Sequence, residues 1–153
     1  LYFFFECGVK KAICFEPIDS TYRILKRNME INNIIQNVTL VKSAVGASCG
    51  AATISHYDIS NIGSTQITLD NSGNIPVVSI DSMHIDDEIK LVKIDVEGFE
   101  KGVIDGSKET LAKHKPYIMI EIQPENFDYI SYELSKMGYK YAQLTGINYL
   151  FYC

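Results

Sequence analysis

Apolar residues alternate along the chain between short strand-like runs and longer stretches with helical spacing. Short runs rich in β-branched residues predict buried strands, at 12–15, 38–41, 91–94 and 117–122. Apolar residues three or four positions apart predict helices, at 20–31, 99–113 and 127–137, with the tail of a helix at 1–7. The first full helix has Asp19 or Ser20 as its expected N-cap and ends at Asn32.

Two further patterns depart from this alternation of strands and helices. Residues 51–54 and 75–80 predict antiparallel strands joined by long polar connections, and residues 139–144 and 148–152 predict a closing hairpin. We therefore expect an α/β fold with a mostly parallel sheet and an antiparallel carboxyl-terminal edge. The length of 153 residues suits a single domain, which we expect to span residues 1–153.

The stretch from Leu91 to Glu100 organises the rest of the chain. Its apolar start predicts a strand buried on both faces, which stops at Asp95 and Glu97, turns at Gly98 and leads into a helix. Two acids at the carboxyl end of a strand lie where open α/β sheets bind ligands. In a regular strand their side chains would point the same way. Glu100 is interpreted as a charge that offsets the dipole of the following helix.

Three predicted strands end in an acid, at Glu16, Asp95 and Glu121. Each acid alone would also serve as a cap for the next helix, but three such ends at one edge of a sheet favour a shared site. A carboxylate after an early strand accepts hydrogen bonds from ribose hydroxyls in nucleotide-binding folds. Glu16 fits that role for either a nicotinamide or an S-adenosylmethionine cofactor. Asp95 and Glu97 suit a cationic group, a metal, substrate hydroxyls or general-base catalysis.

Composition narrows the function classes. The net charge of −5 argues against nucleic acid or an anionic membrane surface as the main partner, and no apolar run is long enough to span a bilayer. Four scattered cysteines indicate free thiols in a reducing, cytoplasmic compartment. The three histidines have no partners at metal-ligand spacing, so no metal site is predicted.

Four blocks of the sequence together resemble the FkbM-like methyltransferases. They occur in the family's order and are Ala-Ile-Cys-Phe-Glu-Pro (12–17), Ser-Ala-Val-Gly (43–46), Pro-Val-Val-Ser-Ile-Asp-Ser (76–82) and Lys-Ile-Asp-Val-Glu-Gly-Phe-Glu (93–100). Gly106 and the segment 111–116 that leads into 120–122 fit the same pattern. The resemblance implies a Rossmann-like class I methyltransferase sheet. It also implies an enzyme that uses S-adenosylmethionine to methylate a hydroxyl of a sugar or other small metabolite.

The same resemblance implies roles for individual residues. Glu16 would hold the cofactor ribose, Ser43 and Ala44 would line the adenine site, and Asp95 would face the methionine end. The expected cofactor-binding residues are Glu16, Pro17, Ser43, Ala44 and Asp95, and the expected catalytic residues are Asp95, Glu97 and Glu121. A small-residue loop at 63–65 would lie over the site. A groove between Glu16, Ala44 and Asp95 is therefore expected.

The family's first strand and its glycine-rich turn have no counterpart before Glu16. That strand is a central one, so its neighbours are expected to lose a ladder partner. The chain also begins at Leu1 without an initiator methionine, and we expect a fragment truncated at its amino end. Two alternatives to the enzyme stay open: a non-catalytic remnant that acts as a binding or interaction domain, and, with less support, an NAD-dependent oxidoreductase.

Overall fold

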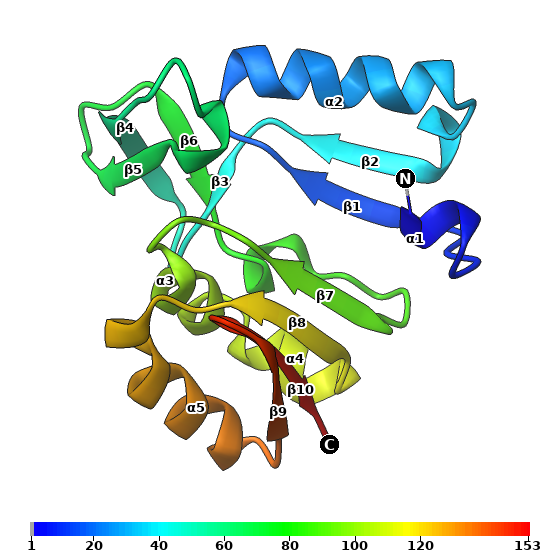
Figure 1. Ribbon diagram of the computed structural model, residues 1–153, viewed down its shortest axis with the longest axis vertical. Helices are drawn as coiled ribbons and strands as arrows, with labels where there is room; N and C mark the ends of the chain where they lie inside the picture. The colour runs from blue at the N-terminus through cyan, green and yellow to red at the C-terminus, as the bar shows by residue number, and fades with distance from the viewer. Residues whose placement is uncertain (1) are drawn as a thin grey trace.

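The computed structural model describes residues 2–153, which form an α/β fold (Figure 1). Its strands are β1 (Ala12–Phe15), β2 (Val38–Val41), β3 (Ala44–Val45), β4 (Gly50–His56), β5 (Gln66–Leu69), β6 (Ile75–Val78), β7 (Leu91–Ile94), β8 (Tyr117–Glu121), β9 (Lys140–Thr145) and β10 (Asn148–Tyr152). Its α-helices are α1 (Tyr2–Phe5), α2 (Asp19–Ile31), α3 (Glu100–Asp105), α4 (Lys108–His114) and α5 (Phe127–Lys136). Short 3-10 turns are η1 (Ile35–Asn37), η2 (Ile62–Ser64), η3 (Asp81–Met83) and η4 (Pro124–Asn126).

The strands pair into three sheets with the orders β1-β2, β7-β8-β10-β9 and β3-β6-β4-β5. β1 pairs in parallel with β2, β7 pairs in parallel with β8, and β10 is antiparallel to both β8 and β9. Figure 1 shows that β1 and β7 run in the same direction. The predicted α/β fold with an antiparallel carboxyl-terminal edge is confirmed.

No strand within residues 2–153 lies between β1 and β7, so the main sheet is divided there. Among the described strands, β1 and β7 therefore have no ladder partner on the sides that face each other. The prediction that the strand at Leu91–Ile94 is buried on both faces is wrong. Val92 and Ile94 pack on the core from one face of β7, whereas Lys93 on the other face is exposed. In β1, Ile13 is 37% exposed.

The largest core lies in the carboxyl-terminal part of the chain. Its twelve buried residues are Val45, Ile94, Val103, Ile104, Leu111, Ile118, Ile120, Ile122, Ile130, Leu134, Tyr139 and Phe151. They come mainly from β8 and from helices α3, α4 and α5, which cover the β7-β8-β10-β9 sheet (Figure 1). The helix expected at 127–137 and the hairpin expected at 139–152 both lie against this core, as α5 and as β9 with β10.

The helix expected at 99–113 is two helices, α3 and α4, which meet at Gly106. A Cβ on Gly106 would lie 2.0 Å from the carbonyl oxygen of Gly46, so only glycine allows this close approach of α3 to the loop after β3. α4 then starts anew, because the carboxylate of Asp81 accepts hydrogen bonds from the backbone N–H groups of Glu109 and Thr110 at 3.1 and 2.8 Å.

The start of α2 also differs from the prediction. The N-cap is Ile18, and Asp19 is already inside the helix. The apolar Ile18 side chain cannot cap the helix, and the Asp19 carboxylate forms ion pairs with Arg23 and Lys42 instead. At the other end, Asn32 is the C-cap as expected, while Ile31 is 60% exposed rather than part of the buried face.

Candidate functional site

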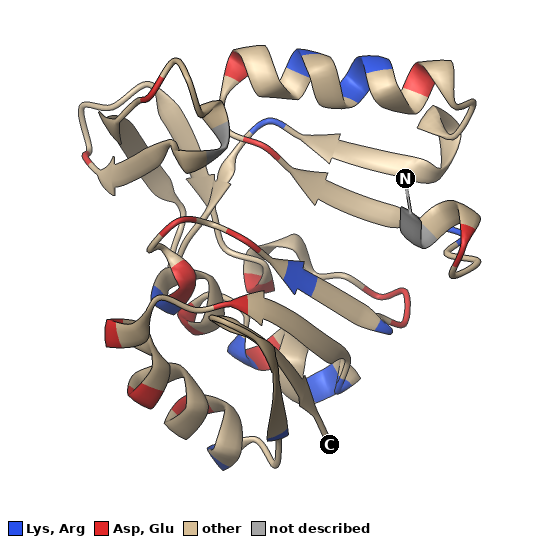
Figure 2. Cartoon of the chain, viewed as in Figure 1, with Lys and Arg blue, Asp and Glu red and all other residues tan. Residues whose placement is uncertain are grey.

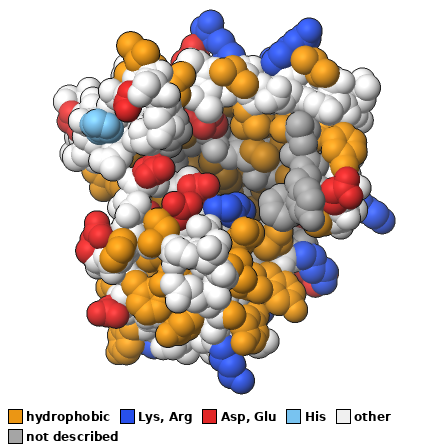
Figure 3. Space-filling view, viewed as in Figure 1, with side chains coloured by type: hydrophobic (Ala, Val, Ile, Leu, Met, Phe, Trp, Pro, Cys, Tyr) orange, Lys and Arg blue, Asp and Glu red, His pale blue; other side chains and the backbone are white. Residues whose placement is uncertain are grey.

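A cavity of about 160 Å³ lies at the carboxyl ends of β1 and β7, beside β3. Its polar lining residues are Glu16, Thr21, Ser43, Thr65, Asp95 and Glu97. Its apolar lining includes Phe15, Pro17, Ala44, Ile62, Val96 and Phe99. Figure 2 shows acidic residues on the segments that follow β1 and β7. We call the sheets β1-β2 and β7-β8-β10-β9 the two half-sheets, and Figure 3 shows acidic side chains beside the hollow between them. Among residues 2–153, no lysine, arginine or histidine lines the cavity.

Glu16 leaves β1 at the wall of this cavity and turns its carboxylate back onto its own backbone. The oxygen Oε1 accepts a hydrogen bond from the Ile18 N–H at 2.8 Å. Burial raises the pKa of the Glu16 carboxyl above its ordinary value, and the Ile18 hydrogen bond opposes that rise. The contact fixes the carboxylate at the strand end, and its second oxygen can accept hydrogen bonds from a ligand.

The segment after β7 is a tight turn rather than a continued strand. Phe99 N–H donates to the carbonyl oxygen of Val96 at 3.1 Å, which closes a four-residue turn. Both central residues have positive φ, +43° at Glu97 and +93° at Gly98. A positive φ is uncommon for a residue with a side chain. The turn therefore corrects the expectation that Asp95 and Glu97 point the same way as in a regular strand.

The turn places its two acids differently. Asp95 is exposed and pairs with Lys93 at 3.2 Å. Glu97 is half-buried, and burial is the first cause that raises the pKa of its carboxyl. The negative charges of neighbouring acids raise it further, namely Asp95, Glu121 and Glu100. A carboxylate with a raised pKa is a stronger base than an ordinary one.

Glu100 is not a surface charge beside a helix end, as its sequence position suggested. Its side chain is 1% exposed, and its two oxygens accept hydrogen bonds from Gly98 N–H at 2.7 Å and from Asn126 Nδ2 at 2.5 Å. Nothing in the spacing of the sequence indicated Asn126, which lies 26 residues away at the start of α5. The structure thus adds a polar pair behind the turn.

The structure brings together most of the residues predicted from sequence. All five expected cofactor-binding residues line the cavity, as do two of the three expected catalytic acids. Glu121 does not line it, although its charge acts on Glu97. The expected groove between Glu16, Ala44 and Asp95 is present. Of the loop expected over the site, Thr65 and the adjacent Ile62 contribute to the lining. The aromatic residues Phe15 and Phe99 were not predicted to line the cavity, although Phe15 directly precedes Glu16 and Phe99 lies two residues after Glu97.

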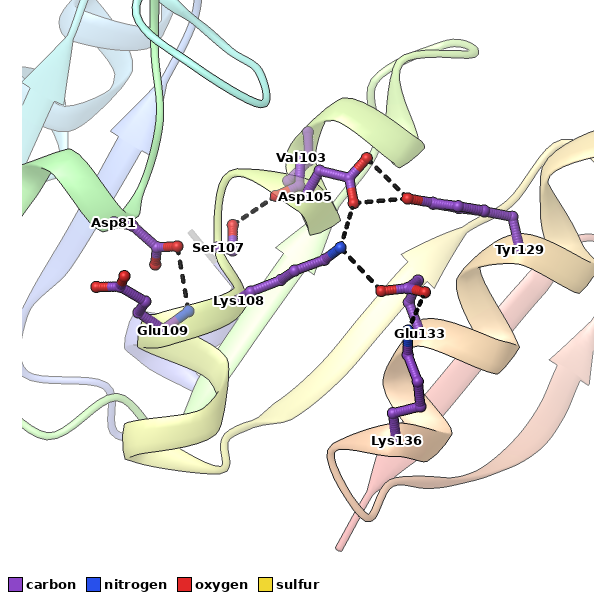
Figure 4. Close-up of polar contacts among 9 residues, drawn as sticks. All are labelled: Asp81, Val103, Asp105, Ser107, Lys108, Glu109, Tyr129, Glu133 and Lys136. Atoms are coloured by element: carbon purple, nitrogen blue, oxygen red, sulfur yellow. Dashed lines mark hydrogen bonds and ion pairs between the residues drawn. The ribbon is translucent and has the colours of Figure 1, made fainter.

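Two other classes of site have no support in residues 2–153. No group of three or more histidine, cysteine, aspartate or glutamate side chains there is arranged to hold a metal ion. A wider depression of about 460 Å³ lies between α4 and α5. Figure 4 shows that three of its charged lining residues form ion pairs: Lys108 contacts Glu133 at 2.8 Å and the nearby Asp105 at 2.7 Å, and Glu133 also contacts Lys136. Ion pairs of this kind connect two helices, so we assign these side chains a structural role rather than a ligand-binding one.

Within the part of the chain that the structure describes, no helix has both the length and the apolar character to cross a membrane.

Two comparisons with known proteins found a match. The family model described as "Methyltransferase FkbM domain" matches residues 1–141. The fold is similar to the crystal structure of Methyltransferase FkbM from Methylobacillus flagellatus KT, with a TM-score of 0.63 and 20% sequence identity. That match covers 94% of this chain and 36% of the other, so the chain spans just over a third of that protein's length. A search of curated protein sequences finds no significant match.

Proposed function

Because the chain belongs to the FkbM methyltransferase family, we propose that it transfers a methyl group from S-adenosylmethionine to a hydroxyl of a sugar or another small metabolite. The observation that carries this proposal is the cavity in which Glu16, Ala44 and Asp95 meet. These residues come from three separate segments, and a shared ligand is the simplest reason for their convergence at the carboxyl ends of parallel strands.

The residues present fit the chemistry of the cofactor. S-adenosylmethionine carries a sulfonium and an ammonium group, and the three acids that line the cavity supply negative charge, unopposed by any basic side chain among the described lining residues. Glu16 would accept hydrogen bonds from the ribose hydroxyls, and Asp95 would face the methionine end. Pro17, Ser43 and Ala44 would border the base. The cavity is smaller than the roughly 300 Å³ of a typical small-molecule site, so the ligand would extend toward the opening between β1 and β7.

When bound, the cofactor supplies a methyl group activated for in-line displacement by an oxygen nucleophile. The protein's own contribution is to position the acceptor hydroxyl and to take its proton. Glu97 is the best placed base, because it lines the cavity and its pKa is raised. Asp95 is the alternative base, and Glu121 would act from behind as a negative charge that keeps Glu97 basic.

Calorimetric titration with S-adenosylmethionine tests the proposal. We expect micromolar binding by the chain, and binding at least about ten-fold weaker in Glu16→Ala, because a hydrogen bond to a charged group is lost. Glu30→Ala is the matched control, since Glu30 is an exposed acid on α2 outside the cavity. Absence of binding by the unmodified chain would contradict the proposal, and equal binding by Glu16→Ala would remove Glu16 from the ribose site.

A second candidate is a non-catalytic binding domain with the same fold. The divided main sheet favours it, because no described strand joins β1 to β7, whose carboxyl ends carry Glu16 and Asp95. The same titration separates the two candidates. The remnant predicts a folded chain that does not bind S-adenosylmethionine, whereas the methyltransferase predicts binding that depends on Glu16. Family membership leaves no observation that favours an oxidoreductase.

The proposal extends to partner and location. The partner would be a small hydroxyl compound rather than nucleic acid or a membrane surface, in keeping with the net charge of −5. All four cysteines are free thiols, as expected for a protein of the reducing cytoplasm.

A further inference from the structure

The turn at residues 96–99 needs support from outside itself. A residue with a side chain in the left-handed region costs on the order of 1–3 kcal/mol and persists only where its surroundings hold it. Glu97 is such a residue, with φ of +43°. One hydrogen bond within the turn, from Phe99 N–H to the Val96 carbonyl oxygen, contributes to holding it. A second comes from a side chain outside the turn, because the N–H of Gly98 donates to Glu100.

Glu100 connects that turn to a distant part of the chain. One carboxylate oxygen accepts from Gly98 N–H, and the other accepts from the side-chain amide of Asn126. Asn126 is itself 7% exposed and is anchored by its backbone N–H, which donates to the Gln123 carbonyl at 2.8 Å. The turn after β7 is therefore fixed to the connection between β8 and α5.

Burying a carboxylate with only uncharged partners is unfavourable unless its oxygens are fully hydrogen-bonded. An apolar residue would fill the same space at lower cost. Glu100 is nevertheless 1% exposed at this position. Its two acceptor oxygens match two N–H donors that approach from different elements, which a glutamine cannot do because its amide has one acceptor oxygen.

We propose that Glu100 and Asn126 are positioning residues, which act through the Gly98 N–H to hold the strained turn that directs Glu97 into the cavity. The pair touches neither cofactor nor acceptor. Its effect is to fix where the carboxylate of the proposed base lies. This inference rests on the proposed function for the role of Glu97, but the structural linkage is measurable without cofactor.

Substitutions that exchange donors and acceptors test the linkage. In Glu100→Gln, the new amide group must face either Gly98 N–H or the Asn126 amide, so one donor loses its acceptor. In Asn126→Asp, two carboxylates face each other. The double variant Glu100→Gln with Asn126→Asp restores the match, because the glutamine oxygen accepts from Gly98 and its amide donates to the aspartate. Rescue by the double variant would distinguish positioning from simple loss of stability.

Two NMR measurements on the cofactor-free chain report on the turn. Hydrogen exchange of the Gly98 amide should become about ten-fold faster in Glu100→Gln, the size expected for loss of one hydrogen bond, and should return in the double variant. The pKa of Glu97, measured by carboxyl titration, should fall toward its ordinary value in Glu100→Gln, where the negative charge of Glu100 is lost as well, so the Gly98 amide is the readout that reports on the position of the turn alone. Exchange at Ile120 in β8 corrects for any change in global stability.

Asp105→Asn is the matched control, since Asp105 is another acid of α3 that pairs with Lys108 and Tyr129, away from the turn. It should change stability without changing the Gly98 amide or the Glu97 titration. Unchanged Gly98 exchange in Glu100→Gln, or failure of the double variant to restore it, would overturn the positioning role. Absence of cofactor binding by the unmodified chain would instead count against the proposed function and leave the linkage intact.

Discussion

The two half-sheets differ in size and in how they are packed. The half-sheet β7-β8-β10-β9 rests with α3, α4 and α5 on a cluster of twelve buried residues. The half-sheet β1-β2 rests with α2 on a smaller cluster, in which three of the residues whose burial the structure describes are buried: Met29, Ile34 and Val38. Each half contains a pair of parallel strands and is covered by helices, but more of the buried apolar residues that the structure describes lie in the first half, so we expect that half to contribute more to the stability of the chain.

The cavity takes one wall from each half. Asp95 and Glu97 belong to the well-packed half, where Glu100 and Asn126 hold the turn that carries them. Glu16 belongs to the thinly packed half. The halves are joined by Phe15 of β1, which packs on the larger core, and by an exposed ion pair between Lys11 and Asp87 at 2.9 Å. Glu97, the proposed proton acceptor, thus lies on the half with the larger core, and Glu16, the residue proposed to bind the ribose, lies on the half with the smaller core.

Removing the same side chain from each half should give the largest contrast. Ile120 in β8 is fully buried, whereas Ile13 in β1 is 37% exposed. Ile120→Ala should lower the free energy of unfolding by about 2–5 kcal/mol, the range for fully buried large aliphatic residues. Ile13→Ala should cost less, about 1–2 kcal/mol, because more than a third of that residue stays exposed to water in the fold and less apolar area is buried there. Urea unfolding measures both, and equal losses would contradict the difference in packing.

A side chain added at the close contact between Gly106 and the loop after β3 should give the next largest effect. Gly106→Ala would place a methyl group 2.0 Å from the Gly46 carbonyl oxygen, and backbone on both sides resists movement. We expect a loss of about 1–3 kcal/mol, as for overpacked interiors. Gly50→Ala is the matched control, since a Cβ there would meet no described atom within 4 Å. Equal melting temperatures for the two variants would contradict a close, rigid contact between Gly106 and the Gly46 carbonyl oxygen.

The smallest expected effect comes from the site itself. The pKa of Glu97 is raised in the fold, so the native state holds its proton over a higher pH range than the unfolded chain. Stability therefore falls as pH rises from the ordinary value of 4.5 through the raised pKa, and the full penalty remains above it. Glu97→Gln should raise the unfolding free energy at neutral pH by on the order of 0.5 kcal/mol, the size of partly exposed charge interactions.

That gain should vanish below pH 4.5, where Glu97 is protonated in both states. Glu88→Gln serves as the control, because Glu88 is an exposed acid on the loop before β7 and forms an ion pair with Lys90, away from the cavity. Urea unfolding at several pH values would measure both variants. A loss of stability in Glu97→Gln at neutral pH would contradict this prediction, because it would mean that the surroundings stabilise the ionised carboxylate of Glu97.

Local patterns in the sequence were sufficient for most elements and for the acids at strand ends. Alternation and helical spacing are properties of neighbouring residues, so β1, β2, β7, β8 and α5 could be predicted from the sequence alone. Glu16 and Asp95 were found for the same reason, because a strand that stops at an acid is visible within a few residues. The expected groove followed from the rule that parallel strands present their carboxyl ends at one edge.

Tertiary contacts decided what those patterns left undetermined. Asp81 caps α4 from 28 and 29 residues away, and Asn126 reaches Glu100 across 26 residues. Burial of Glu100 depends on those distant partners, so its local sequence indicated only a charge near a helix end. By itself the sequence determined which elements form and which acids end them. Only the tertiary structure decided which acid is buried and how the turn at Glu97 is held, because both depend on donors that the chain brings together after folding.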